Sequence, residues 1–207
     1  MSRPVTEVVT LPLHPEANAE GAIRALKAVL SKQDGFRSMK WGRWVQDKDK
    51  VQLIISWDDL SYHKKFEQSD ADFATYRAAL RPVLTGPPTM YHVYLDPAAV
   101  ERILKTPVVE VATFYSVPAD YSQEAGEFLD LLGSFKGGLG FLHADIVEDI
   151  SMDGSNVKGR GYFALLAWAS IALHVEAKES DAVQNNIHLI KGARKTNDIE
   201  WHYVSIM

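Results

Sequence analysis

The sequence predicts an α+β fold of two fused ferredoxin-like βαββαβ repeats whose antiparallel sheets form one barrel within the chain. A frame of Trp, five residues, His, five residues and Ser-Asp-Ala begins at Trp57 and again at Trp168, an offset of 111 residues (168 minus 57). Residues 7–11 match residues 110–114 at an offset of 103. Both offsets are about half of the 207 residues, which indicates a duplicated unit.

The difference between the offsets has a local explanation. Residues 45–47 match residues 147–149 at an offset of 102, so the extra length of the second repeat enters after position 149. Residues 149–161 are rich in Gly, Ser, Asn and Asp, which favour turns and loops. Extra length is tolerated in a surface loop, so the repeated elements remain intact.

The first half opens with a strand and a helix. Residues 5–13 are apolar and β-branched and stop at a His-Pro pair, which predicts a strand. Residues 16–33 place Ile23, Leu26 and Leu30 at helical spacing and end at Asp-Gly, which predicts an amphipathic helix.

The rest of the first half adds three strands and a second helix. Residues 39–47 and 51–57 are two short strands around the polar turn Lys-Asp-Lys. A helix then begins near residues 58–61, whose side-chain oxygens can cap it, and extends toward Pro82. Residues 90–95 form the last strand, so the order is β-α-β-β-α-β.

The second half repeats this order after a linker. We expect repeats at residues 1–96 and 108–207, with residues 97–107 as a linker that holds about two helical turns. The expected strands are residues 108–117, 141–149, 162–168 and 199–206, and the expected helices are residues 121–135 and 170–193. A βαββαβ unit covers one sheet face with helices and leaves the other bare. Two bare faces in one chain can enclose an eight-stranded barrel with room for one small ligand.

Composition excludes several classes of function. The formal net charge is -5 with no basic run, so a nucleic-acid partner is not expected. The chain has no cysteine, which excludes disulfides and thiolate chemistry. The seven histidines show no HxH, HxxxH or HExxH spacing, so we expect no metal site. No dinucleotide fingerprint is present, and we expect no cofactor; haem bound through one axial His is the alternative. No signal-peptide or membrane-spanning pattern is present, and we expect a cytoplasmic protein.

The repeated Trp at the end of the third strand and the His in the following helix carry a family resemblance. With the βαββαβ order, Trp57, His63, Trp168 and His174 make the chain resemble the dimeric α/β-barrel superfamily. Within it, the chain is similar to tandem antibiotic-biosynthesis-monooxygenase (ABM) proteins of fungal type. The alternative for these four residues is architectural: each Trp fills the core and each His packs at the junction of strand and helix.

Strand alternation selects residues that would face the barrel lumen. His143 and Asp145 share one face of a strand, where Asp145 would tune His143 as a general base. The matching positions of the first half hold Trp41 and Arg43, expected to bind substrate. The other expected catalytic residues are His92, His202 and Tyr115, and the other expected substrate-binding residues are Tyr94, Thr10 and Thr113. The alternative for His143 and Asp145 is a salt bridge or a solvated pair at the rim.

The resemblance implies a cofactor-independent monooxygenase of secondary metabolism that acts on an aromatic or polyketide-like substrate. A base would ionise a phenol or enol, and the carbanion would react with dioxygen. The same base would serve a polyketide cyclase, an isomerase or a dehydratase, and a non-catalytic ligand-binding or stress-response protein is the further alternative. A monomer and a homodimer both fit, because the duplication already supplies a second repeat.

Overall fold

The computed structural model describes residues 2–152, 154, 157–191 and 199–207. The chain divides into two compact units, Met1–Pro97 with Ile206–Met207 and Ala98–Ser205, so the boundary falls at the start of the expected linker. Each half has the predicted order of strands and helices, and the α+β class with two ferredoxin-like repeats is confirmed.

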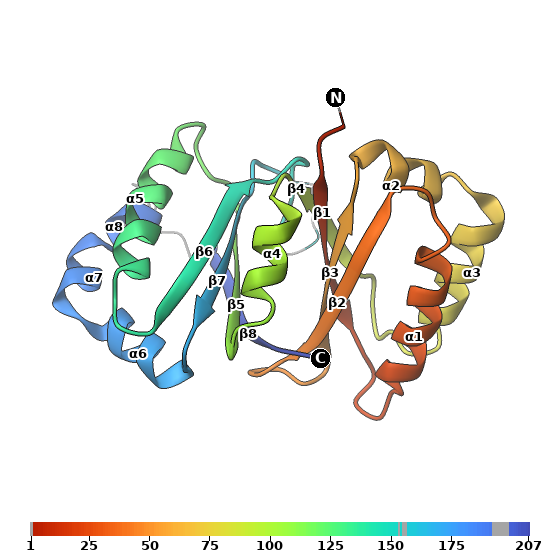
Figure 1. The fold of residues 1–207 in the computed structure, drawn as a ribbon, viewed down its shortest axis with the longest axis horizontal. Coiled ribbons are helices and arrows are strands. Elements are labelled where there is room, and N and C mark those ends of the chain that lie inside the picture. Colours follow the sequence, from red (N-terminus) through yellow and green to blue (C-terminus); the bar gives the residue numbers. More distant parts are fainter. Residues whose placement is uncertain (1, 153, 155–156, 192–198) are drawn as a thin grey trace. The chain divides into compact units, whose positions relative to one another are not determined.

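The N-terminal half has an antiparallel sheet with the strand order β4-β1-β3-β2. Its strands are β1 (Val5–Pro12), β2 (Phe36–Trp44), β3 (Lys50–Trp57) and β4 (Thr89–Val93), and its helices are α1 (Ala19–Leu30), α2 (Leu60–Glu67) and α3 (Asp70–Leu80). Helices α1 and α3 lie on the same face of this sheet (Figure 1). The hydrophobic core of this half lies between these helices and the sheet, and it includes Val9, Leu26 and Leu53.

The second predicted helix of this half is in fact two helices. The Asp59 carboxylate accepts a hydrogen bond from the Ser61 backbone N–H and so caps α2. The chain turns extended at Ser69 (φ −81°, ψ 105°), which separates α2 from α3. Sequence periodicity continues across this break because both helices turn apolar residues toward one core, among them Phe66 and Leu80.

The C-terminal half has the strand order β8-β5-β7-β6. Its strands are β5 (Val108–Phe114), β6 (Gly138–Asp145), β7 (Tyr162–Trp168) and β8 (Ile199–Ile206). Its helices are α5 (Tyr121–Gly133), α6 (Ile171–Glu179), α7 (Asp181–Asn186) and α8 (His188–Lys191), preceded by α4 (Pro97–Ile103) in the expected linker. The single helix predicted for residues 170–193 is divided at Ser180, and its last two residues lie outside the described part of the chain.

The strand register confirms the repeat and identifies the counterpart of His92 in the second half. Phe36 and Gly138 lie opposite Trp57 and Trp168, and a register shift follows each at the same place. In the last strands, Glu7 lies opposite His92 whereas Glu110 lies opposite Tyr203. The counterpart of His92 in the second repeat is therefore Tyr203 and not the neighbouring His202.

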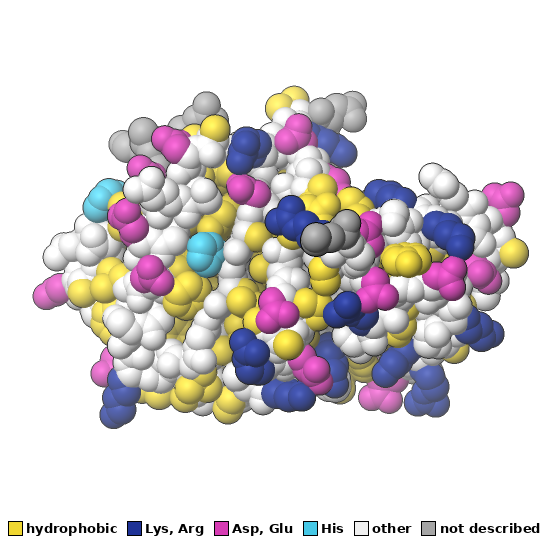
Figure 2. Space-filling model, turned by 45° about the horizontal axis from the view of Figure 1, so that its top comes forward, with side chains coloured by type: hydrophobic (Ala, Val, Ile, Leu, Met, Phe, Trp, Pro, Cys, Tyr) yellow, Lys and Arg dark blue, Asp and Glu magenta, His cyan; other side chains and the backbone are white. Residues whose placement is uncertain are grey.

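The visible surface carries charged side chains of both signs. On the face shown in Figure 2, acidic and basic side chains are interspersed, and neither sign dominates a continuous patch. Among the described residues, no helix combines the length and the apolar character needed to cross a bilayer.

Candidate functional site

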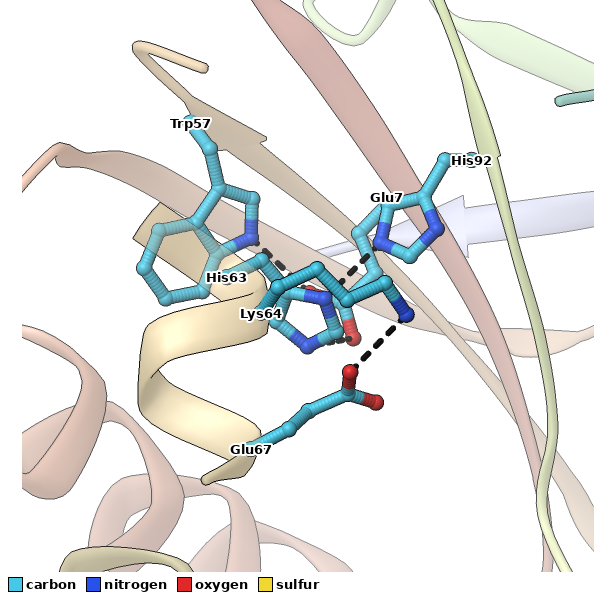
Figure 3. Close-up of polar contacts among 6 residues, drawn as sticks. All are labelled: Glu7, Trp57, His63, Lys64, Glu67 and His92. Carbon is cyan, nitrogen blue, oxygen red and sulfur yellow. Dashed lines mark hydrogen bonds and ion pairs between the residues drawn. The ribbon is translucent and has the colours of Figure 1, made fainter. Parts of the chain in front are cut away.

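Four side chains of the N-terminal half form a buried hydrogen-bonded chain, shown in Figure 3. The indole Nε1–H of Trp57 donates to Glu7 Oε2 at 2.9 Å. The other carboxyl oxygen, Glu7 Oε1, lies 3.5 Å from His63 Nε2. The opposite nitrogen of that ring, Nδ1, shares a hydrogen bond of 2.9 Å with His92 Nε2. The imidazole of His63 thus connects the carboxyl group to a second imidazole. We call these four residues the N-terminal tetrad.

Each member of the N-terminal tetrad comes from a different element. Alternation along β1 places Glu7 on the same face as Val9 and Leu11, both of which pack against the helices. Register then brings His92 of β4 directly opposite Glu7. Trp57 ends β3, and His63 lies in the first turn of α2, whose start is fixed by its Asp cap. The fold therefore assembles the tetrad from residues that are up to 85 positions apart (92 minus 7).

Burial changes the chemistry of the carboxyl group in this tetrad. Glu7 is only 3% exposed, and loss of solvent raises its pKa from 4.5 to about 7. The hydrogen bond from Trp57 and the positive charge that His92 can carry act in the opposite direction. A carboxyl group with a pKa near neutrality can both accept and return a proton at physiological pH, as a general acid–base catalyst must.

The C-terminal half contains the same arrangement with one substitution. Trp168 Nε1–H donates to Glu110 Oε2 at 3.0 Å, and that oxygen lies 3.5 Å from His174 Nε2. His174 Nδ1 hydrogen-bonds the hydroxyl of Tyr203 at 2.5 Å, where the other half has an imidazole. We call these four residues the C-terminal tetrad.

The C-terminal tetrad is also shaped by burial. Desolvation raises the pKa of Glu110 from 4.5 to about 7 and lowers the pKa of His174 from 6.5 to about 4. Desolvation also raises the pKa of the Tyr203 phenol to about 12. The folded form therefore favours a neutral carboxylic acid beside a neutral imidazole. Because the phenol is a much weaker base than an imidazole, this tetrad has no second site to which a proton could pass.

Each tetrad borders a cavity between its sheet and its helices. The N-terminal cavity has a volume of about 1010 Å³ and reaches Glu7 and His63. Its aromatic wall comprises Phe66, Phe73 and Tyr76, and the last two rings are stacked with centroids 5.9 Å apart. The C-terminal cavity is smaller, about 380 Å³, and reaches Glu110 and His174.

The donors of the N-terminal tetrad could also approach a metal ion. Glu7, His63 and His92 each offer one ligand atom, and these atoms lie within 4.8 Å of one another. Two imidazoles and a carboxylate are a usual ligand set for a transition metal. In the present arrangement both nitrogens of His63 face tetrad partners, so a metal would have to replace one of these contacts. Spacing in the sequence did not reveal this group because its members lie on three different elements.

The predicted pairing of His143 with Asp145 is wrong. His143 Nδ1 hydrogen-bonds the Tyr162 hydroxyl, and Asp145 forms an ion pair with Arg160 at 3.1 Å. Desolvation lowers the pKa of His143, and the carboxylate that opposes this shift is Asp130 and not Asp145. A role for His143 and Asp145 in turnover stays a prediction.

The other residues predicted for the lumen fall on both faces of the sheets. His92 and Trp41 lie on the helix side, where His92 joins the tetrad and Trp41 packs against the core. Thr10 points to the opposite face, where its hydroxyl donates to Gln52 Oε1 at 3.3 Å. On the second sheet, Thr113 and His202 are buried on the face away from the helices.

The last three predicted residues have partners near the ends of strands. The Tyr115 hydroxyl donates to Glu200 at 3.2 Å, and the Arg3 guanidinium lies 3.8 Å from the centroid of the Tyr94 ring. Arg43 donates to the backbone carbonyl of Lys48 in the β2–β3 hairpin. A substrate site inside a barrel stays a prediction, and the two cavities described above lie instead between a sheet and its own helices.

Comparison with known proteins gives a likeness of structure without a likeness of sequence. No family model matches the chain, and no curated protein matches it. An anthrone oxidase-like protein has a TM-score of 0.67 at 10% identity, and the match covers 100% of this chain and 94% of that one. A candidate monooxygenase from Fusobacterium nucleatum has a TM-score of 0.62 at 10% identity, over 99% and 93% of the two chains. Another, from Lactobacillus acidophilus, has a TM-score of 0.57 at 10% identity, over 99% and 94%. Likeness at this level of identity shows the fold alone, so the chain has, along its whole length, the α+β fold of these monooxygenase-like proteins.

Proposed function

We propose that the protein is a cofactor-independent monooxygenase that oxidises an aromatic, polyketide-like substrate in the N-terminal cavity. The observation that carries the proposal is the position of Glu7: it is buried, reaches the cavity, and has a pKa of about 7. A base with that pKa can deprotonate a phenol or an activated methylene at neutral pH. The similarity of the fold to an anthrone oxidase-like protein is consistent with this chemistry.

The proposed reaction needs only the substrate and dioxygen. Glu7 takes a proton from an activated CH₂ group or its enol, and the carbanion reduces dioxygen and forms a C–O bond to it. The resulting peroxide anion takes the proton back and becomes a hydroperoxide. Loss of water then converts the carbon to a carbonyl, so CH₂ plus O₂ gives C=O plus H₂O.

The rest of the N-terminal tetrad would support this base. Trp57 holds Glu7 Oε2, which leaves Oε1 to exchange protons. His63 and His92 can accept the proton from Oε1 through two successive nitrogens and so keep it away from the carbanion until the peroxide has formed. The aromatic wall of Phe66, Phe73 and Tyr76 suits a flat substrate.

Arginines on α3 add a second element of recognition. Arg77 and Arg81 line the same cavity and are exposed. They lie four positions apart, so they point to the same side of the helix end. An anionic group on the part of the substrate remote from the reacting carbon would fit them.

The decisive experiment is oxidation of anthrone, measured as dioxygen uptake and formation of anthraquinone above the uncatalysed rate. Removing a general base typically costs on the order of 10²- to 10⁴-fold, so we expect Glu7→Gln to reduce the rate by at least about 100-fold. The matched variant Glu110→Gln should retain the wild-type rate within about twofold, because its tetrad lacks the second imidazole. His92→Tyr, which copies the C-terminal tetrad, should fall between them.

Three outcomes would argue against the proposal. A full rate in Glu7→Gln would remove this residue as the base, and loss of turnover in His143→Ala with retained folding would place the base at His143 instead. Conversion of substrate without uptake of dioxygen would favour the cyclase, isomerase or dehydratase, since the same base serves those reactions.

We also propose that the protein is a tandem ABM protein of fungal type, that it is cytoplasmic, and that it acts as a monomer or a homodimer.

A further inference from the structure

The two cavities differ at positions that correspond through the repeat. Both keep the Glu, Trp and His of the tetrad, and three neighbouring positions at the offset of 111 residues change in character. Glu67, Met90 and His92 of the N-terminal half become Lys178, Trp201 and Tyr203 in the C-terminal half. Glu67 and Met90 line the N-terminal cavity, and Lys178 and Trp201 line the C-terminal cavity. The charge at the position of Glu67 is therefore reversed in the C-terminal half, where Lys178 stands.

The ammonium group of Lys178 lies beside an aromatic ring, whereas Glu67 has an ion-pair partner. In the N-terminal half, the Glu67 carboxylate is paired with Lys64 Nζ at 2.9 Å (Figure 3). Lys178 forms no ion pair with any carboxylate in the described part of the chain. Its ammonium group instead lies 4.5 Å from the centroid of the Trp201 ring. An ammonium group at the edge of a cavity can pair with the anionic group of a ligand that enters the cavity.

The wall of the C-terminal cavity is also different. The aromatic wall of the N-terminal cavity is replaced at the corresponding positions by Ala177, Gln184 and Ile187. The last two of these line the smaller cavity, together with Phe128 and several aliphatic side chains. A volume of about 380 Å³ accommodates a ligand of one or two fused rings. Trp201 also lines this cavity; it is 39% exposed, and the Lys178 ammonium group lies over its ring.

We propose that the C-terminal cavity is a second ligand site that binds a small aromatic carboxylate or similar organic anion without converting it. The anionic group would pair with Lys178, and the ring would lie among Phe128, Ile187 and Trp201. This site is distinct from the proposed oxygenation site and requires no chemistry there. A chain of this kind would hold substrate in one half and a second acidic aromatic compound in the other.

The test is calorimetric titration of the intact chain with 1-naphthoate and with 1-naphthamide, which has nearly the same shape but no charge. The background variant carries Glu7→Gln together with Arg77→Gln and Arg81→Gln, so that the result depends neither on turnover nor on anion binding in the N-terminal cavity. We expect naphthoate to bind at least tenfold more tightly than naphthamide. Lys178→Met should remove that preference while leaving naphthamide affinity within about twofold.

The repeat supplies the matched control. Glu67→Gln changes the corresponding position of the other half and should leave both affinities unchanged. Trp201→Ala should weaken both ligands, because it removes the ring surface on which they lie. The inference is overturned if the two compounds bind equally, if Lys178→Met has no effect, or if the wild-type chain binds neither. Lys178 is exposed on α6, so its replacement is not expected to disturb folding.

Discussion

The buried pair Glu110 and His174 makes opposite contributions to stability as the pH changes. The folded-state pKa of Glu110 is raised, so its contribution is complete below about 4.5 and is lost as the pH rises through about 7. The folded-state pKa of His174 is lowered, so its contribution is complete above about 6.5 and is lost as the pH falls through about 4. From about pH 4.5 to about pH 6.5 the two contributions change in opposite directions and cancel. In this range, folding moves one proton from the imidazole to the carboxylate.

The size of each contribution follows from the pKa differences. They are about 2.5 for the carboxyl group (7 minus 4.5) and about 2.5 for the imidazole (6.5 minus 4). At about 1.4 kcal/mol per pKa unit, each single contribution is on the order of 3 kcal/mol. Both side chains are nearly fully buried, so solvent does little to reduce this value. The positive charge of Lys178 lowers the pKa of both groups, so every variant keeps this residue.

Single variants should expose the hidden contributions. Relative to the wild type at each pH, the free energy of unfolding of Glu110→Gln should rise by about 3 kcal/mol between pH 4.5 and 7. That of His174→Asn should fall by a similar amount between pH 4 and 6.5. The double variant should run parallel to the wild type. Urea unfolding followed by tryptophan fluorescence at several pH values measures all four curves.

The comparison with the wild type is essential, because many other carboxylates titrate in this range. Slopes of the opposite sign would mean that Glu110 and His174 form an ion pair in the folded chain, with a carboxylate beside an imidazolium. Curves of both single variants parallel to the wild type would mean that neither group is perturbed. Either result would refute the reasoning from burial.

Three further outcomes follow from the same structure. Trp57→Phe removes the hydrogen bond that opposes the raised pKa of Glu7, so the rise of kcat/KM with pH should move to higher pH, whereas Trp168→Phe should not move it. Leu26→Ala in the fully buried core of the N-terminal half should cost about 2–5 kcal/mol in the free energy of unfolding, measured by urea titration. His143→Ala should keep the wild-type rate of anthrone oxidation, because the ring lies at Tyr162 and not in the N-terminal cavity.

The sequence was sufficient for the fold because the repeat and the hydrophobic periodicity are strong signals. The frame around Trp57 and Trp168 located the third strand and following helix of each half, and the loop insertion explained the change of offset. Element boundaries were less accurate, since Ser69 and Ser180 break helices whose apolar periodicity continues past them.

The site could be predicted only in part. The matched positions of Glu7, Trp57 and His63 were visible, but the residue of β1 predicted to bind substrate was Thr10, on the face opposite Glu7. The alternation of side chains between the two faces of β1 was predicted correctly. What it could not show is that a carboxyl group is buried among apolar residues and meets an imidazole from the next helix. A shift of one residue in the last strand also hid the correspondence of His92 with Tyr203.

A structural role and a catalytic role for Glu7 lead to opposite expectations for one variant. A glutamine of the same shape would accept the Trp57 hydrogen bond without the cost of ionising a buried carboxyl group. At pH 8, above the folded-state pKa of about 7, Glu7→Gln should therefore be more stable than the wild type and yet nearly inactive. Thermal unfolding at pH 8 and the anthrone assay on the same sample test both halves of this expectation. A variant that loses activity and stability together would indicate that the carboxylate serves the fold, and the proposed base would have to be sought elsewhere.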